Sequence, residues 1–135
     1  IEKVISLARG VMEEFEEAKI PYGLAINRND IDLSQERGYF HYPGLGESHL
    51  EHILRILGRL DYRVPPFFET TLIDISRRQG NYTTAVIITA RVLETYIEPL
   101  NQLSRNVSRA VVISLEEEYL QELDNNIIKY GGEVE

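Results

Sequence analysis

Apolar residues recur along the chain at two spacings, one typical of helices and one typical of strands. Residues 2–19 repeat apolar side chains every three to four positions, which predicts an amphipathic helix. The acidic pairs at 13–14 and 16–17 fall outside this stripe, and we interpret them as a solvated helix surface. The predicted inner face consists of Val4, Leu7, Ala8, Val11, Phe15 and Ala18.

Short apolar runs between turn residues predict the strands. The runs at 83–90 and 109–115 are apolar at successive positions, as in parallel strands that are buried on both faces. A shorter run at 22–27 predicts another strand, and aromatic residues near 39–42 predict an antiparallel edge strand. A further strand is expected to start at residue 131.

Helix start signals separate these strands. Ser48 and Thr95 are each followed three positions later by glutamate, the spacing of a capping box, in which the two side chains bond free backbone N–H groups at the helix start. Pro66 suits the first position of another helix, which Gly80 ends. The stretch 116–132 predicts a final helix, with glutamates at its positive end.

Strands that alternate with helices through short loops predict an α/β fold, with a three-layer, mostly parallel sheet and helices on both faces. The apolar runs near residues 24, 87 and 112 are expected to lie side by side in this sheet. Binding sites of such sheets lie outside the carboxyl ends of the strands. We therefore expect the trailing loops to converge on one rim. The expected binding residues are Asn27, Ser48, Thr89 and Arg91.

The composition is that of one globular domain. The chain has 135 residues, 43% of them hydrophobic and 27% charged, which is enough for one buried core. A net charge of −8 with scattered arginines argues against a nucleic-acid partner. No apolar run approaches the roughly 20 residues of a membrane-spanning helix. The absence of cysteine favours a cytoplasmic setting, while leaving open a membrane anchor elsewhere in the parent protein.

The two ends of the chain resemble cuts in a longer protein. Ile1 stands where a helix is already beginning, and the chain stops at Glu135, where a strand is starting. We expect residues 1–135 to be a single domain that is incomplete at the N-terminus and at the C-terminus. A sheet that lacks a strand exposes open backbone and apolar faces, so we also expect this piece to associate with itself.

The stretch GLGESHLEHIL, residues 44–54, concentrates the candidate chemistry of the chain. Two histidines three positions apart on a helix can share a metal ion with a nearby carboxylate. This interpretation predicts a divalent metal ion and a metal-dependent hydrolase. The alternative is a capped helix end with a solvated face, which is favoured because capping explains Ser48 and Glu51 without a ligand. The candidate metal ligands are Glu47, Ser48, His49 and His52.

Four phrases of the sequence together resemble one known family. They are VISLARGVMEEFEEAKIPYGLAINR, GLGESHLEHILRILGRL, AVIITARVLETYIEPLNQLS and AVVISLEEEYLQEL. In these phrases, over nearly its whole length, the chain resembles the MoxR-associated domain of unknown function 58 family, which is von Willebrand factor A-like. The resemblance implies a three-layer α/β fold whose first strand precedes Ile1.

The resemblance also implies a function and bears on the metal site. Von Willebrand factor A-like domains bind a metal ion through three loops. Ser48 corresponds most nearly to a threonine ligand of the second loop, whereas Ala90 stands where the third loop has an aspartate. A complete site of this kind is therefore not expected, nor any other cofactor in this segment. The implied function is a non-enzymatic protein-interaction domain that works with a MoxR-type AAA ATPase in the assembly or maturation of protein complexes.

Overall fold

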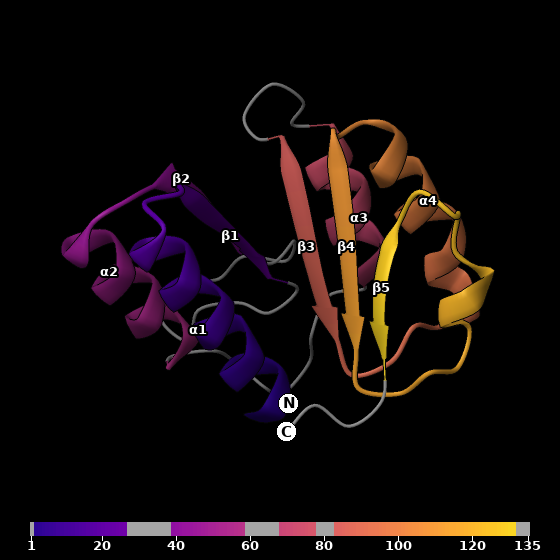
Figure 1. Ribbon diagram of the computed structural model, residues 1–135, viewed down its shortest axis with the longest axis horizontal. Helices are drawn as coiled ribbons and strands as arrows, with labels where there is room; N and C mark the ends of the chain where they lie inside the picture. The colour runs from indigo at the N-terminus through magenta and orange to yellow at the C-terminus, as the bar shows by residue number, and fades with distance from the viewer. Residues whose placement is uncertain (1, 27–38, 59–67, 78–82, 132–135) are drawn as a thin grey trace. The chain divides into compact units, whose positions relative to one another are not determined.

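The computed structural model describes residues 2–26, 39–58, 68–77 and 83–131 (Figure 1). Within them the chain is mixed α/β, with four α-helices, a two-stranded antiparallel sheet and a three-stranded parallel sheet. The predicted α/β class is therefore confirmed. In chain order the elements are α1 (Glu2–Glu17), β1 (Tyr22–Ile26), β2 (Tyr39–Gly44), α2 (Glu47–Leu57), α3 (Phe68–Ser76), β3 (Thr84–Thr89), the 3-10 turn η1 (Glu94–Tyr96), α4 (Ile97–Arg105), β4 (Arg109–Ser114), the 3-10 turn η2 (Leu120–Glu122) and β5 (Ile128–Gly131).

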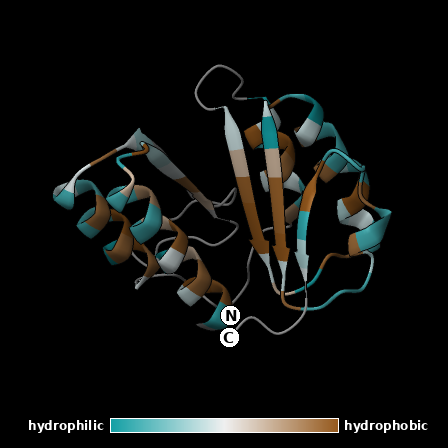
Figure 2. Cartoon of the chain, viewed as in Figure 1, coloured by the Kyte–Doolittle hydropathy of each residue, from teal (hydrophilic) through white to brown (hydrophobic). Residues whose placement is uncertain are grey.

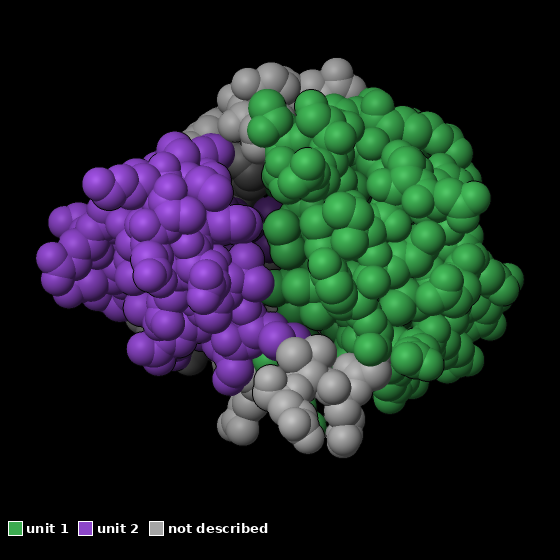
Figure 3. Space-filling model, viewed as in Figure 1, with its two compact units in different colours: residues 1–4, 72–135 green, residues 5–71 purple. Residues whose placement is uncertain are grey.

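The chain divides into two compact units, which Figure 3 distinguishes by colour. Residues 5–71 form one of them, called the hairpin unit below, and residues 1–4 with 72–135 form the other, called the sheet unit. The expectation of a single domain over residues 1–135 remains a prediction.

The hairpin unit is built around an antiparallel pair of strands. β1 and β2 pair in a register that places Ala25 opposite Phe40, with an irregularity between Tyr22 and Leu24. The edge strand predicted near residues 39–42 is thus confirmed as an antiparallel strand. One core joins α1, β1 and α2, because apolar side chains from all three are buried together. They are Met12, Tyr22, Ile53, Ile56 and Leu57, with Ile5, Phe15, Leu24, Leu50 and Leu54 packed around them.

The sheet unit contains three parallel strands in the order β3-β4-β5 (Figure 1). Ile87 pairs with Val112, and Ile113 with Tyr130. Hydrophobic residues fill the greater part of β3 and β4 (Figure 2), as the apolar runs at 83–90 and 109–115 predicted. α4 packs against β4 and buries its apolar face beside that strand. The buried side chains of this region include Leu100, Leu103, Ala110, Val112 and Ser114.

The final helix predicted over residues 116–132 is wrong. Between residue 116 and β5, the described chain contains only the single turn η2, and β5 then pairs in parallel with β4. Tyr119 takes a left-handed conformation, with φ of 61°, which ends any helix at that point. The last described strand runs from Ile128 to Gly131, and apart from Gly131 the strand predicted to start at residue 131 lies outside the described residues.

Buried polar residues of α4 explain why a turn is preferred in this stretch. The side-chain oxygen Oδ1 of Asn101 accepts a hydrogen bond from the backbone N–H of Asp124 at 2.9 Å. Asn126 Nδ2 lies 3.5 Å from Ser104 Oγ, and Arg105 forms an ion pair of 3.3 Å with the Asp124 carboxylate. These bonds hold residues 124–126 as a turn against α4. A continuous helix would draw the N–H of Asp124 into its own ladder and leave the buried Asn101 oxygen without that donor.

Two of the predicted element ends also differ. α4 begins at Ile97 after the turn η1, and Thr95 forms no side-chain capping bond, so its predicted capping box is wrong. α3 ends at Ser76, before the predicted stop at Gly80, and Asn106 Nδ2 donates to Ser76 Oγ at 2.7 Å near that end. The predicted start of α3 at Pro66 lies outside the described residues.

The prediction of one sheet holds for two of its three apolar runs. The runs near residues 87 and 112 are neighbours in the parallel sheet, but the run near residue 24 belongs to a different sheet and pairs only with β2 in the described part of the chain. An antiparallel hairpin satisfies the backbone of β1 without a parallel neighbour. The predicted single rim of loops therefore does not follow from the described strands.

Replacing Gly10 by alanine should raise the free energy of unfolding by about 0.5–1 kcal/mol. Gly10 lies within α1, and no atom stands within 4 Å of the position that its Cβ would take. The matched control is Gly46→Ala, which should lower stability because Gly46 has a φ of 113°. Urea unfolding followed by circular dichroism measures both. Effects of the same sign would contradict the described backbone at one of the two glycines.

Candidate functional site

The N-terminus of α2 is held by a residue from a distant part of the chain. α2 begins at Glu47. The capping residue before it is Gly46, which has no side chain to bond the free N–H groups of the helix. Instead, the N–H of Gly46 donates a hydrogen bond of 2.8 Å to Oε1 of Glu16, thirty residues earlier. Ser48 lies exposed within the first turn. The capping box predicted for Ser48 and Glu51 is therefore wrong, and a carboxylate from α1 does the corresponding work.

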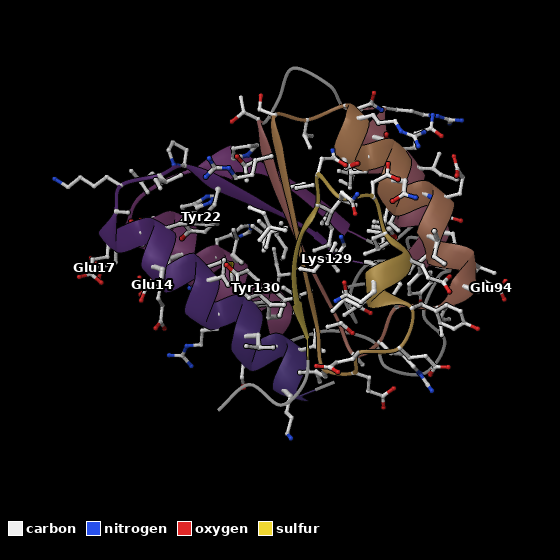
Figure 4. All side chains as sticks on the ribbon, turned by 45° about the vertical axis from the view of Figure 1, so that its right-hand side comes forward. Glu14, Glu17, Tyr22, Glu94, Lys129 and Tyr130 are labelled. Carbon is white, nitrogen blue, oxygen red and sulfur yellow. The ribbon has the colours of Figure 1, made fainter. Side chains whose placement is uncertain are left out.

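Glu16 also binds the first strand. Its second oxygen, Oε2, accepts a hydrogen bond of 2.8 Å from the hydroxyl of Tyr22, which is only 5% exposed. One carboxylate thus joins α1, β1 and the start of α2. Figure 4 shows Glu14 and Glu17 projecting from the side of α1 that faces away from Tyr22.

The sequence interpretation of Glu16 as a solvated residue is wrong. Three of the four acidic residues at 13–14 and 16–17 are exposed as predicted, but Glu16 is half-buried. It stands one turn after Met12, the most buried side chain of α1, and therefore lies on the same side of the helix. The apolar stripe that the sequence suggested omitted Met12, which is why Glu16 was placed on the outer face.

His49 packs against Tyr22 near the start of α2. Its Nε2 lies 2.6 Å from the backbone oxygen of Tyr22, and its ring meets the Tyr22 ring edge-on with centroids 4.7 Å apart. A carbonyl oxygen only accepts, so Nε2 carries the proton in this bond. A Cβ at Gly44 would stand 2.8 Å from His49 Nδ1, so glycine leaves room for the ring. His49 therefore packs between the start of β1 and the end of β2.

The predicted metal ligands do not form a cluster in the described residues. Glu47, Ser48 and His52 are exposed on α2, and His49 is turned toward Tyr22. No group of three or more histidine, aspartate or glutamate side chains in the described ranges is arranged to hold a metal ion. The geometry of this part of the chain thus gives the hydrolase hypothesis no support.

Burial raises the pKa of the Tyr22 hydroxyl well above its ordinary value of about 10. The hydrogen bond to Glu16 and the negative charge of that carboxylate act in the same direction. Tyr22 therefore stays protonated and keeps donating to Glu16 at pH values at which a solvated tyrosine ionises.

A second polar region lies at the carboxyl ends of β3 and β4. We call it the carboxyl rim and define it as residues 89–91 and 114–118. The ladder between the strands continues into it, because Leu115 N–H donates to the Thr89 oxygen at 3.2 Å and Glu116 N–H to the Ala90 oxygen at 3.2 Å. The two loops are therefore held side by side.

Two hydroxyl groups fix the shape of the carboxyl rim. Thr89 Oγ1 donates to the backbone oxygen of Arg91 at 2.9 Å, and Ser114 Oγ donates to that of Glu116 at 2.6 Å. Ser114 is fully buried, so its hydroxyl supports the loop and is not accessible as a nucleophile. The charged side chains are what the rim exposes, namely Arg91, Glu116, Glu117 and Glu118.

The structure brings together only part of the predicted site. Thr89 and Arg91 lie on the carboxyl rim of the sheet unit, as expected for loops that follow parallel strands. Ser48 lies on α2 in the hairpin unit. Asn27 lies outside the described residues. Sequence reasoning missed Glu16 and Tyr22 as structural partners, whereas the loop that begins at the buried Ser114 follows a strand that the sequence did predict.

No family model, curated protein or solved structure matches the chain. No helix in the described residues has the length and apolar character needed to cross a membrane.

Replacing Glu16 by alanine should lower the free energy of unfolding by about 1–3 kcal/mol, because two partly buried donors lose a charged acceptor. These donors are the Gly46 N–H and the Tyr22 hydroxyl. Glu14→Ala is the matched control, since Glu14 is an exposed glutamate of the same helix, and its effect should stay within about 0.5 kcal/mol. Urea unfolding measures both. Similar losses in the two variants would show that Glu16 has no special structural role.

The raised pKa of Tyr22 predicts a loss of stability at alkaline pH. Below about pH 10 both the folded and the unfolded chain keep the tyrosine proton. Above it the unfolded chain releases the proton while the folded chain retains it, so the free energy of unfolding falls as pH rises, by at most about 1.4 kcal/mol per pH unit. Tyr22→Phe should remove this part of the slope between pH 9 and 11, roughly the range around the ordinary tyrosine pKa.

Thermal or urea unfolding at a series of pH values measures this slope. Tyr130→Phe is the control for the loss of one phenol, because Tyr130 is 57% exposed. A Tyr22→Phe variant that loses stability with pH as steeply as the wild type would contradict the prediction.

Proposed function

We propose that the chain is a non-enzymatic protein-interaction domain that binds a partner protein through its carboxyl rim. The proposal rests on which polar groups of the rim bond to one another and which are exposed to solvent. The hydroxyls of Thr89 and Ser114 and the backbone of both loops bond to one another, whereas Arg91 and three glutamates point to solvent. A rigid loop pair that displays charges of both signs is suited to recognising a complementary protein surface.

The same geometry argues against catalysis at this rim. A nucleophilic hydroxyl needs access to substrate and a base within hydrogen-bond reach. The Ser114 hydroxyl is buried and donates to a backbone oxygen, and the Thr89 hydroxyl donates to another. Both hydroxyls are thus bonded to backbone oxygens, and neither is hydrogen-bonded to a side chain that could serve as the base.

We further propose that the fold is of the von Willebrand factor A type and that the partner is a MoxR-type AAA ATPase of the cytoplasm. The resemblance of the four sequence phrases to the MoxR-associated family supports this proposal. A parallel sheet with a polar rim at its carboxyl ends is compatible with it, because this is where parallel α/β sheets bind their ligands. Protein-complex assembly or maturation is then the process in which the domain takes part.

A photocrosslinking residue tests the rim in the cell that produces the protein. Benzoylphenylalanine in place of Arg91 should crosslink to an AAA ATPase, identified by mass spectrometry. The same residue in place of Arg109 is the matched control, because Arg109 is also exposed but stands at the opposite, amino end of β4. The ATPase should be captured from position 91 and not from position 109.

Two outcomes would overturn the proposal. Equal capture of the ATPase from both positions would show that the rim does not determine binding. If no ATPase is captured from position 91 although the variant is expressed normally, the proposed partner is wrong.

Arg91→Glu provides a second readout, since reversal of an exposed interface charge should slow association with the purified ATPase and change its dependence on salt.

A further inference from the structure

The two edges of the parallel sheet differ in chemistry. β5 has four residues and carries a lysine, Lys129, in its middle. β3 has six residues, with the sequence TAVIIT and no charge. Natural edge strands are usually short or carry charges, because an uncharged edge invites pairing with another strand. β5 therefore has the character of a protected edge, and β3 has the character of a central strand.

The apolar rows of the sheet lead to the same distinction. On one face, Val86, Val111 and Ile128 form a row across the three strands. Ile88, Ile113 and Tyr130 form the next row. Each row ends in exposed side chains at β5, where Ile128 is 41% and Tyr130 57% exposed, but in half-buried side chains at β3. Figure 4 shows Lys129 and Tyr130 pointing to opposite sides of β5.

The outer edge of β3 is open in the described residues. β3 pairs with β4 along its whole length, and no other described strand pairs with it. Its alternating side chains are apolar on both faces, which is the pattern of a strand with neighbours on both sides. A strand of this composition with one free edge is a site for addition of a further strand.

We propose that the open edge of β3 pairs with β3 of a second copy of the chain. The two strands run antiparallel about a two-fold axis perpendicular to the sheet. Residues that oppose each other in an antiparallel pair lie on the same face, so the axis passes through Val86 or Ile87. With Val86 at the axis, the row Ile128–Val111–Val86 continues into the same row of the second copy. The three-stranded sheet then becomes a six-stranded one.

Charge selects this edge over the other. Two copies of β3 bring no charged side chains together, whereas two copies of β5 paired about Lys129 would place like charges opposite each other. The net charge of −8 on each chain opposes association at long range. Salt screens this repulsion, so the dimer should be more stable at about 0.5 M salt than at low ionic strength.

Sedimentation equilibrium of the 135-residue chain tests the proposal with two lysine variants. Val86→Lys and Ile128→Lys place the same charge at the two ends of one apolar row. The wild type and Ile128→Lys should dimerise with similar affinity. Val86→Lys should weaken the dimer at least about tenfold, because it places two lysines close together at the pairing edge. Thermal unfolding of each variant checks that it is folded.

Hydrogen exchange of the wild type gives a second readout that needs no variant. The amides of β3 that point away from β4 should become protected as the protein concentration rises, while β5 amides should not change. A monomer at all concentrations up to roughly 100 μM, well above the range of specific homodimers, would overturn the proposal. So would a dimer that Ile128→Lys disrupts and Val86→Lys does not, since it would use the other edge.

Discussion

The carboxylate of Glu16 is the point at which the three main elements of the hairpin unit meet. One oxygen accepts the N–H of Gly46 and the other accepts the hydroxyl of Tyr22. The first bond satisfies a backbone donor at the start of α2, where a negative charge also interacts favourably with the helix dipole. The second holds the first strand against the helix that precedes it. His49, from α2, also bonds the backbone oxygen of Tyr22.

These contacts give the polar stretch at residues 44–54 a structural role. Its glycines are present for geometric reasons, since Gly46 needs a positive φ and Gly44 leaves space for a histidine ring. Its first histidine packs against Tyr22, and its serine lies exposed. A stretch that is rich in potential ligands thus functions as a structural corner. The loops that follow the parallel strands also expose charged side chains, Arg91 and Glu116 among them, and the paired strands hold those loops in place.

The parts of the fold that the sequence predicted are those that depend on local composition. The strands at 84–89 and 109–114 were found because apolar side chains at successive positions rarely form anything but a buried strand when the run is short. The final helix failed because its apolar spacing could not reveal the buried Asn101 oxygen, which binds the backbone of Asp124 and favours a turn. Both predicted capping boxes were wrong. For Ser48 and Glu51 the reason is tertiary, because Glu16 from α1 bonds the backbone at the start of α2. Half of the candidate site, Thr89 and Arg91, followed from the strand ends alone, but Glu16 required a contact across thirty positions.

A helix that receives its capping carboxylate from another helix has a consequence for how the chain folds. α2 has no local start signal in use, and its 11 residues are too few for stable helicity in water on their own. The stability of α2 as a helix therefore depends on α1 and the first strand, which supply the Glu16 bond and the shared core. On the ribosome, α1 emerges before α2, so the apolar side of α1 lacks its α2 partner until residue 57 has been synthesised.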